Sequence, residues 1–332
     1  MRRTLRFLVV LVPWLGTAGC EVEWGGAEFR LENPAPEAPP EPVAGTEAAK
    51  PPTPLPDGHL LFAVRIDPST GASRAVPIAG IDADGLRPIA FPEDPDESWR
   101  PRFAERFIFE GRELELHASG RRIGSLVFDG GMTAPRQDCM PVATGRSLVP
   151  PGSPAPRLAF AFEPDSQATD PARYVTFEAD NRMRTFGPIL AEQILRARGE
   201  SRPFLAQRAV LEAVAWPGDA NPAFAATYLI GDDLEGPAPD GDAVSLFFLA
   251  RFDPQRGYYP VWSEFRRYEG GTGKEVFTYV DAVNGPSGRV DFVELRDGSG
   301  TRRLAASRET ENERGLDWTE ATLCRAESLL EP

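Results

Sequence analysis

The sequence predicts an α+β fold with a mainly antiparallel β-sheet, a central helical pair and a short C-terminal helix. Three observations support this prediction. Short stretches with alternating apolar and polar residues, separated by turn residues, are typical of antiparallel strands. Near the middle of the chain, apolar residues instead recur at helical spacing. The last apolar stretch before the C-terminus follows a pattern that begins helices.

The first predicted strands lie in the N-terminal half. HLLFAVRID is followed by the turn residues PSTG and by a second strand, SRAVPIAGI. In RELELHASG, Leu114 and Leu116 alternate with polar residues, and Ser119-Gly120 supplies a turn. RLAFAFEPD is a further strand. His117 falls on the polar side of its strand, so we expect a surface residue rather than a catalytic base.

The helical pair is predicted in the middle section. The apolar residues of TFGPILAEQILRARG are spaced as on one face of a helix, and Gly199 follows as a C-terminal stop. Ser201 precedes Arg202 and Pro203 as an N-cap would, which predicts a second helix in RPFLAQRAVLEAVA. We expect both helices to pack their apolar faces on a sheet.

Strands resume at AVSLFFLARFD. LFFLARFDPQRG shares six of twelve residues with the earlier LLFAVRIDPSTG, which indicates either a duplicated unit or two hairpins with the same turn chemistry. VWSEFRRYEGGTGKEVFTYVDAV predicts two strands joined by a glycine-rich turn. Two more strands meet at Asp297-Gly298.

The short C-terminal helix is predicted in LDWTEATLCRAESLL. Asp317 and Glu320 are spaced as an N-cap and its partner in the third helical position. This helix would carry Cys324.

The N-terminus has the layout of a secretory signal peptide. Arg2, Arg3 and Arg6 precede an apolar run and a stretch of small residues. The apolar run of about nine residues is too short for a bilayer-spanning helix, which needs about 20. An ordinary cleaved signal is one interpretation of this segment.

The end of this segment, TAGC, resembles the lipobox of bacterial lipoproteins. The resemblance covers residues 1–20 only, and Thr17 stands where that family most often has Leu. It implies that residues 1–19 are a lipoprotein signal peptide and that Cys20 becomes the first mature residue and carries the lipid. Because Glu21 rather than Asp follows, it also implies the outer membrane of the bacterial cell envelope.

A proline-rich segment follows the cysteine. Nine of the 24 residues from Asn33 to Pro56 are proline, a composition that favours an extended spacer reaching roughly 70 Å. We therefore interpret residues 20–56 as a lipid-anchored linker. The remaining chain is predicted as a β-rich lobe, 57–165, and an α+β lobe, 166–332, which form either one domain or two.

Two cysteines remain if Cys20 carries lipid. Cys139 and Cys324 are an even pair in a chain that we expect to be exported, so a disulfide between them is predicted. Two separate buried thiols are the alternative. Neither has a second cysteine nearby, so we expect no metal site.

The formal net charge of −14 bears on the choice of partners. Loss of the three signal-peptide arginines would make the charge −17. Such an average charge repels phosphate backbones, so we expect no nucleic-acid partner.

Catalytic motifs are absent from the sequence: it has no G-x-S-x-G, H-E-x-x-H or S-x-x-K. GDDLEGPAPDGD is rich in carboxylates but lacks the spacing of a calcium loop, so a solvated turn is favoured over a cation site. An aromatic segment offers candidate binding residues, although core packing is the favoured role for most of its rings; the residues are Tyr258, Tyr259, Trp262 and Tyr268.

We therefore predict a lipid-anchored bacterial envelope lipoprotein with a non-enzymatic binding or structural role. Its expected partners are the membrane, through the lipid on Cys20, and an envelope protein or glycan; no cofactor is expected. The alternative is a hydrolase acting in the periplasm or at the cell surface through paired carboxylates, which need no local motif.

Overall fold

A computed structural model describes residues 51–319, except 83–84, 90–91, 93–94, 134–140, 154, 157, 165–170, 172–175, 217–220, 286–287, 300–301 and 310–313. From Pro52 onward the chain forms one compact unit. Cys20, Cys139 and Cys324 lie outside the described residues, so lipid attachment and the disulfide stay predictions.

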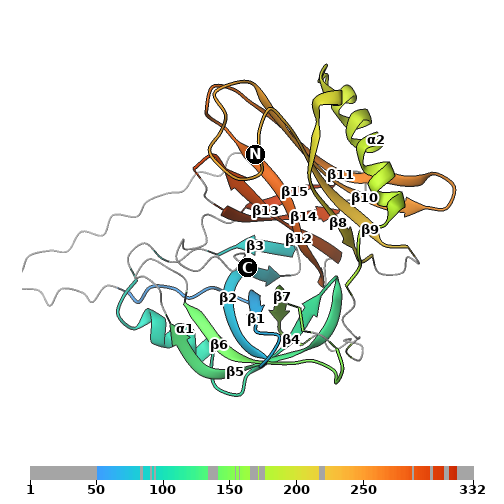
Figure 1. Ribbon diagram of the computed structural model, residues 1–332. Helices are drawn as coiled ribbons and strands as arrows, with labels where there is room; N and C mark the ends of the chain where they lie inside the picture. The colour runs from blue at the N-terminus through green and yellow to red at the C-terminus, as the bar shows by residue number, and fades with distance from the viewer. Residues whose placement is uncertain are drawn as a thin grey trace, which may run out of the picture. The chain divides into compact units, whose positions relative to one another are not determined.

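Six strands of the N-terminal half close into a barrel (Figure 1). They pair in the order β1-β7-β4-β5-β6-β2, and β2 pairs with β1 to complete the ring, while β3 extends the sheet beyond β2. All these pairings are antiparallel. The strands are β1 (His59–Ile66), β2 (Ala72–Asp82), β3 (Gly85–Pro88), β4 (Glu113–Ala118), β5 (Arg121–Thr133), β6 (Val142–Leu148) and β7 (Leu158–Phe162).

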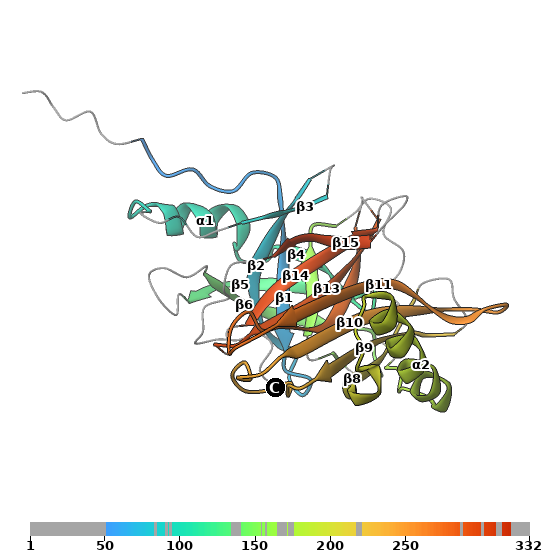
Figure 2. The ribbon, with the colours of Figure 1, turned by 90° about the horizontal axis from the view of Figure 1, so that it is seen from above.

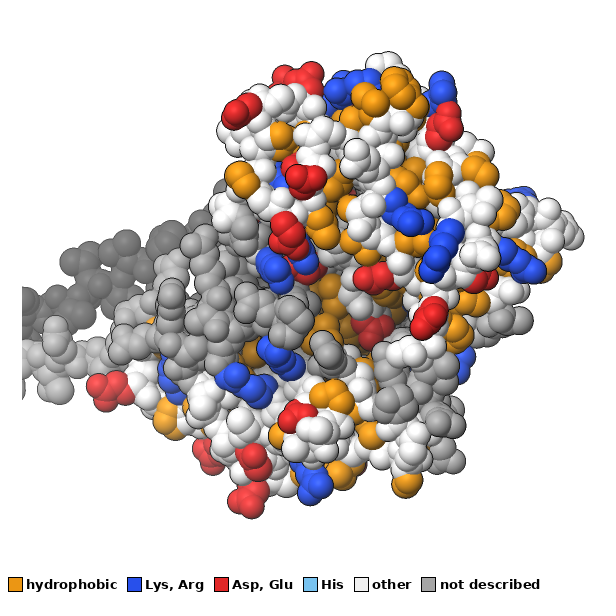
Figure 3. All heavy atoms as spheres, viewed as in Figure 1, with side chains coloured by type: hydrophobic (Ala, Val, Ile, Leu, Met, Phe, Trp, Pro, Cys, Tyr) orange, Lys and Arg blue, Asp and Glu red, His pale blue; other side chains and the backbone are white. Residues whose placement is uncertain are grey.

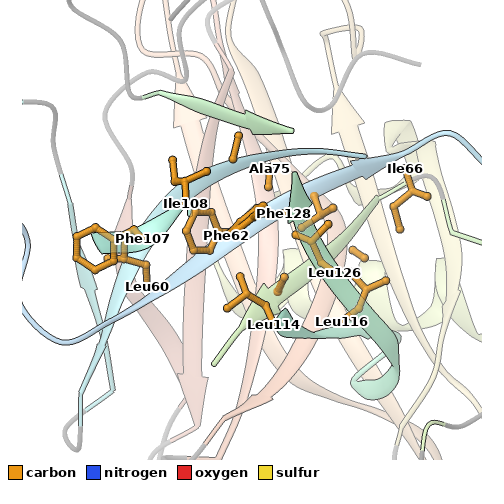
Figure 4. Packing of buried hydrophobic residues seen from close by; sticks show 14 of the residues in the cluster. Leu60, Phe62, Ile66, Ala75, Phe107, Ile108, Leu114, Leu116, Leu126 and Phe128 are labelled. Carbon is orange, nitrogen blue, oxygen red and sulfur yellow. The ribbon is translucent and has the colours of Figure 1, made fainter. Parts of the chain in front are cut away.

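Apolar side chains fill the barrel (Figure 4). Phe62 of β1 meets Phe128 of β5 edge to face, with ring centroids 5.5 Å apart. The helix α1 (Trp99–Phe107) adds Trp99, Phe103 and Phe107 to the same cluster, because residues four apart lie on one helix face. The barrel interior is therefore a packed core rather than a ligand channel.

Two further four-stranded antiparallel sheets follow in the chain. Between the barrel and these sheets comes α2 (Asn181–Ala197), and a short 3₁₀ turn, η1 (Pro203–Leu205), leads into β8. One sheet comprises β8 (Gln207–Val214), β9 (Ala223–Ile230), β10 (Ala243–Asp253) and β11 (Gly257–Tyr268). The other comprises β12 (Glu275–Gly285), β13 (Gly288–Asp297), β14 (Arg302–Glu309) and β15 (Arg314–Thr319).

The β12–β15 sheet lies between the barrel and the β8–β11 sheet. Its Phe292 stacks on Phe160, on the outside of the barrel, with centroids 4.3 Å apart. The opposite face shares a cluster with Phe247 and Trp262 of the β8–β11 sheet. The outer face of that sheet is covered by α2 (Figures 1 and 2). Both faces of each sheet are thus buried over part of their area.

The predicted α+β class with a helical pair is wrong, because the described chain is mostly β. The first helix of the pair exists as α2: Asp180 caps its N-terminus, and Gly199 follows it with φ 79°. The predicted second helix is instead η1 and β8. RAVLEAV fits either periodicity, and pairing with the open edge of β9 decides for the strand.

The prediction of a C-terminal helix beginning at Asp317 is also wrong. Arg314–Thr319 forms β15, which pairs with β14 and extends its sheet. The remainder of the predicted helix lies outside the described residues. The boundary predicted near Asp165 falls between β7, which ends the barrel, and α2.

The repeated sequence forms two hairpins with the same turn chemistry. After β1, Asp67 accepts the backbone N–H of Ser69 at 2.8 Å, and Gly71 adopts φ 73°. After β10, Asp253 accepts the backbone N–H of Gln255 at 2.8 Å, and Gly257 adopts φ 76°. The shared residues therefore include those that each turn requires.

Candidate functional site

The candidate aromatic residues lie on β11, and three of the four are buried. Tyr258 packs beneath α2 and donates to the Pro222 carbonyl at 3.1 Å. Trp262 packs against Phe247 and donates to Glu264 at 2.9 Å. Tyr268 donates to Asp232, and Tyr259 is partly exposed. The segment is thus committed largely to the core and offers no exposed ring platform.

The acidic loop from Gly231 to Asp242 is organised by a buried ammonium group. Lys274, in the glycine-rich turn after β11, is 2% exposed. Its Nζ donates to Asp232 Oδ1 at 3.0 Å and to the carbonyl oxygens of Asp233 and Gly236 at 2.8 and 3.2 Å. These oxygens surround the lysine, which holds the position that a bound cation would occupy in a metal loop.

The glycine-rich turn joins two sheets rather than two paired strands, because β11 and β12 belong to different sheets. Gly270, Gly271 and Gly273 all adopt positive φ, between 61° and 77°. This path places Lys274 beneath the acidic loop. Two features of the sequence could have indicated this pairing: a single lysine in a glycine-rich turn and an earlier loop that is rich in carboxylates.

A polar junction connects the tip of the β4–β5 hairpin to β12. The Asp281 carboxylate accepts the backbone N–H of Ser119 at 2.9 and 3.0 Å and that of Ala282 at 2.7 Å. The Gly120 N–H donates to the Ala282 carbonyl at 3.0 Å. Burial raises the pKa of Asp281 to about 7, although these backbone donors oppose the shift.

A β-bulge aims Asp281 at this hairpin. Tyr279 pairs with Val293 and Asp281 with Phe292, so Val280 has no partner in the register. The extra residue turns Asp281 to the face that carries Phe292, toward the barrel. Bulges often lie next to active sites, where they change the direction of a side chain, so Asp281 is a candidate catalytic residue.

A second ionic group lies on the opposite face of the same strands. Arg289 holds Asp291 through Nε at 3.0 Å and Nη2 at 2.8 Å, and Tyr279 donates to the same carboxylate at 3.0 Å. The Arg289 guanidinium lies 4.3 Å from the ring centroid of Trp216. Burial, followed by the charge of Asp291, raises the pKa of Tyr279 well above its usual value.

His117 is buried, contrary to the surface position that its alternation predicted. It is 7% exposed, stacks on Phe162 with centroids 4.3 Å apart, and lies 3.3 Å from Glu115. Burial, followed by the charge of Arg122, lowers its pKa to about 4. The face of β4 that looked solvent-facing is covered because β12 packs on it.

Similarity to known proteins gives no further guidance. A scan against protein-family models, a search of curated proteins and a search of solved structures found no match to this chain. None of the described helices is long and apolar enough to cross a membrane. Within the described residues, no cluster of three or more His, Cys, Asp or Glu side chains could hold a metal ion.

Exposed apolar residues lie at α2 and the turn that follows it, together with arginines that form no ion pair within the described part of the chain. Phe204 is 78% exposed, Leu205 49% and Ile189 46%. In Figure 3, basic and hydrophobic side chains are intermixed where Figure 1 shows α2. We define the α2–η1 surface by six residues, namely Arg182, Arg184, Arg198, Phe204, Leu205 and Arg208.

The four arginines of this surface form no ion pair with any described residue. Arg182 and Arg184 lie in the first turn of α2, and Arg198 lies at its C-cap. Arg208 pairs in register with Tyr228, so it is on the face of the sheet that α2 covers. Sequence reasoning missed this surface because it assigned the segment after Ser201 to a packed helix.

Proposed function

We propose that this chain is a lipid-anchored bacterial envelope lipoprotein whose folded unit has a non-enzymatic binding role. The lipobox-like end of the N-terminal segment, TAGC, supports the anchor. The observation that supports a binding role is the α2–η1 surface, which combines exposed Phe204 and Leu205, after the C-terminal end of α2, with four arginines that form no ion pair with a described residue. Unpaired charge beside exposed apolar area is typical of an interaction surface.

The anchor is tested by replacing Cys20 with Ser. We expect the wild-type protein to stay with membranes washed in high salt and the Cys20→Ser variant to be released, because each buried lipid methylene contributes about 0.8 kcal/mol. Cys139→Ser is the matched control and should stay membrane-bound. Retention of Cys20→Ser on washed membranes, or an unlipidated N-terminal peptide by mass spectrometry, would contradict the proposal.

A carboxylate-dependent hydrolase is the second candidate, and the raised pKa of Asp281 favours it, because a general acid needs a pKa near neutrality. Against it, Asp281 is held by backbone N–H groups and Asp291 by Arg289 and Tyr279. Hydrolysis of an envelope glycan that disappears in Asp281→Asn, while the variant stays folded, would decide for the enzyme.

A further inference from the structure

We propose that the α2–η1 surface docks the folded unit on a bilayer containing anionic lipids. This inference rests on the proposed binding role and names the partner of that surface. It departs from the expectation that the average charge sets, since a net charge of −14 on the full chain would repel anionic headgroups.

The local charge of this region has the opposite sign to the average. Residues 178–208 contain six arginines and four carboxylates, Glu178, Asp180, Glu192 and Glu200, so the segment has an excess of two positive charges. Glu192 is paired with Arg196, and Glu200 with Arg202 and Arg267, so neither glutamate neutralises the four arginines of the surface. Screening confines electrostatic attraction to about 10 Å at moderate salt, so a nearby surface responds to this patch rather than to the whole chain.

The apolar part of the surface projects from a fixed turn. Pro203 is buried, and the N–H of Ala206 donates to its carbonyl oxygen at 3.1 Å. Phe204 and Leu205 stand between these two anchored positions and point to solvent. Of the large hydrophobic residues in the described part of the chain, Phe204 is the most exposed.

The combination fits a lipid surface better than a glycan. Guanidinium groups bind phosphate through paired hydrogen bonds, and the acyl boundary below the headgroups accepts aromatic and aliphatic side chains. An anionic glycan would engage the arginines but would offer no apolar layer to Phe204 and Leu205. The predicted proline-rich linker of roughly 70 Å would let the surface return to the bilayer that holds the anchor.

The test uses the full mature chain with Cys20→Ser, so that no lipid anchor contributes. Binding is measured by co-sedimentation with phosphatidylcholine vesicles that contain or lack phosphatidylglycerol. We expect binding only to the anionic vesicles, weakened by salt. In the same background, Arg198→Gln with Arg208→Gln should lower the partition coefficient about 30-fold, and Phe204→Ala with Leu205→Ala about tenfold.

Matched controls come from the barrel part of the chain. Arg65→Gln with Arg121→Gln removes two exposed arginines, and Phe109→Ala removes a ring that is 50% exposed. These variants should bind anionic vesicles as the parent does. Equal losses in the controls and the surface variants would overturn the inference, as would binding that does not depend on anionic lipid.

The outcomes separate this inference from the anchor proposal. A lipid on wild-type Cys20 together with no vesicle binding by the Cys20→Ser chain would leave the anchor standing and refute the docking surface. Vesicle binding by the Cys20→Ser chain, with no lipid on the wild type, would support the docking surface and refute the anchor. If the surface variants instead lose a co-purifying envelope protein and the parent binds no vesicles, the surface serves a protein and the inference is wrong.

Discussion

The acidic loop from Gly231 to Asp242 and the α2–η1 surface are both charged, but they differ in where their counter-charges lie. The loop surrounds the ammonium of Lys274, which comes from the glycine-rich turn after β11, and Arg296 pairs with Glu235 of the loop. The arginines of the α2–η1 surface have no partner among the described residues. The buried charge of Asp232 therefore contributes to stability through its pairing with Lys274, whereas the arginines of the surface are available to a partner. Counter-charge, rather than charge density, separates the two regions.

The largest expected effect comes from breaking the internal pairing of the loop. Lys274→Met removes the ammonium and leaves Asp232, itself 3% exposed, without its counter-charge. Removal of one partner of a buried pair costs about 3–5 kcal/mol, so we expect a loss of that order in the free energy of unfolding by denaturant titration.

Adding Asp232→Asn to Lys274→Met serves as the control. It removes the stranded carboxylate, so part of the lost stability should return. A loss below about 1 kcal/mol in Lys274→Met alone would mean that solvent reaches the loop. The contrast between the two charged regions would then fail.

Two buried groups at the junction of the barrel and β12 should give opposite pH dependences. The folded pKa of Asp281, about 7, lies above its ordinary value of 3.8, so its stabilising contribution is present below about pH 4 and is lost as the pH rises to about 7. The folded pKa of His117, about 4, lies below its ordinary value of 6.5, so its contribution is present above pH 6.5 and lost as the pH falls to about 4.

These contributions oppose each other in the wild-type protein between about pH 4 and 6.5. The shifts correspond to about 4 kcal/mol for Asp281 and about 3 kcal/mol for His117. We therefore expect Asp281→Asn to become more stable as the pH rises through this range and His117→Gln to become less stable. Thermal and denaturant unfolding of both variants at several pH values checks the signs.

Parallel pH profiles in the two variants would refute the opposing shifts. Below about pH 4 a different set of groups acts, because hydrogen bonds from Thr144 and Gly131 lower the pKa of Asp129. Its stabilising contribution is lost as the pH falls through its lowered pKa. Measurements at and above pH 4 keep this loss apart from the titration of Asp281 and His117.

The sequence predicted much of the strand pattern because turn chemistry is local. The Asp-Pro turns after β1 and β10 carry their own signals in an aspartate that accepts turn N–H groups and a glycine with positive φ. Gly199, predicted as the helix stop, likewise follows α2, although the helix begins at Asn181, four residues before the predicted segment. These residues act within a few positions of each other, so no tertiary information is needed.

The errors arose where distant contacts decide the structure. The sequences of β8 and β15 predict helices, but each segment forms a strand because it pairs with the edge of a neighbouring strand. β8 pairs with β9, and β15 pairs with β14. His117 alternates as a solvent-facing residue but is covered by another sheet. The buried ammonium of Lys274 depends on a loop some 40 residues earlier in the chain, a distance that no local motif spans.

The smallest expected effect concerns the stability of the α2–η1 surface itself. Arg208→Gln removes a charge without a partner among the described residues, and Phe204→Ala removes a ring that is mostly in water. Substitutions of this kind at the surface change the free energy of unfolding by no more than about 0.5 kcal/mol. By contrast, Phe248 lies beneath α2 on the β8–β11 sheet, and Phe248→Ala should lower the free energy of unfolding by about 3–5 kcal/mol because it leaves a cavity in the packed core.

Denaturant unfolding of the three variants decides between a binding surface and a structural one. Phe204 already contacts water in the folded state, so truncating it changes little of the area buried on folding and should leave the midpoint nearly unchanged. A loss above about 1 kcal/mol in Phe204→Ala would show that the ring packs against the fold. The α2–η1 surface would then resemble the acidic loop, because its side chains would stabilise the fold rather than bind a partner.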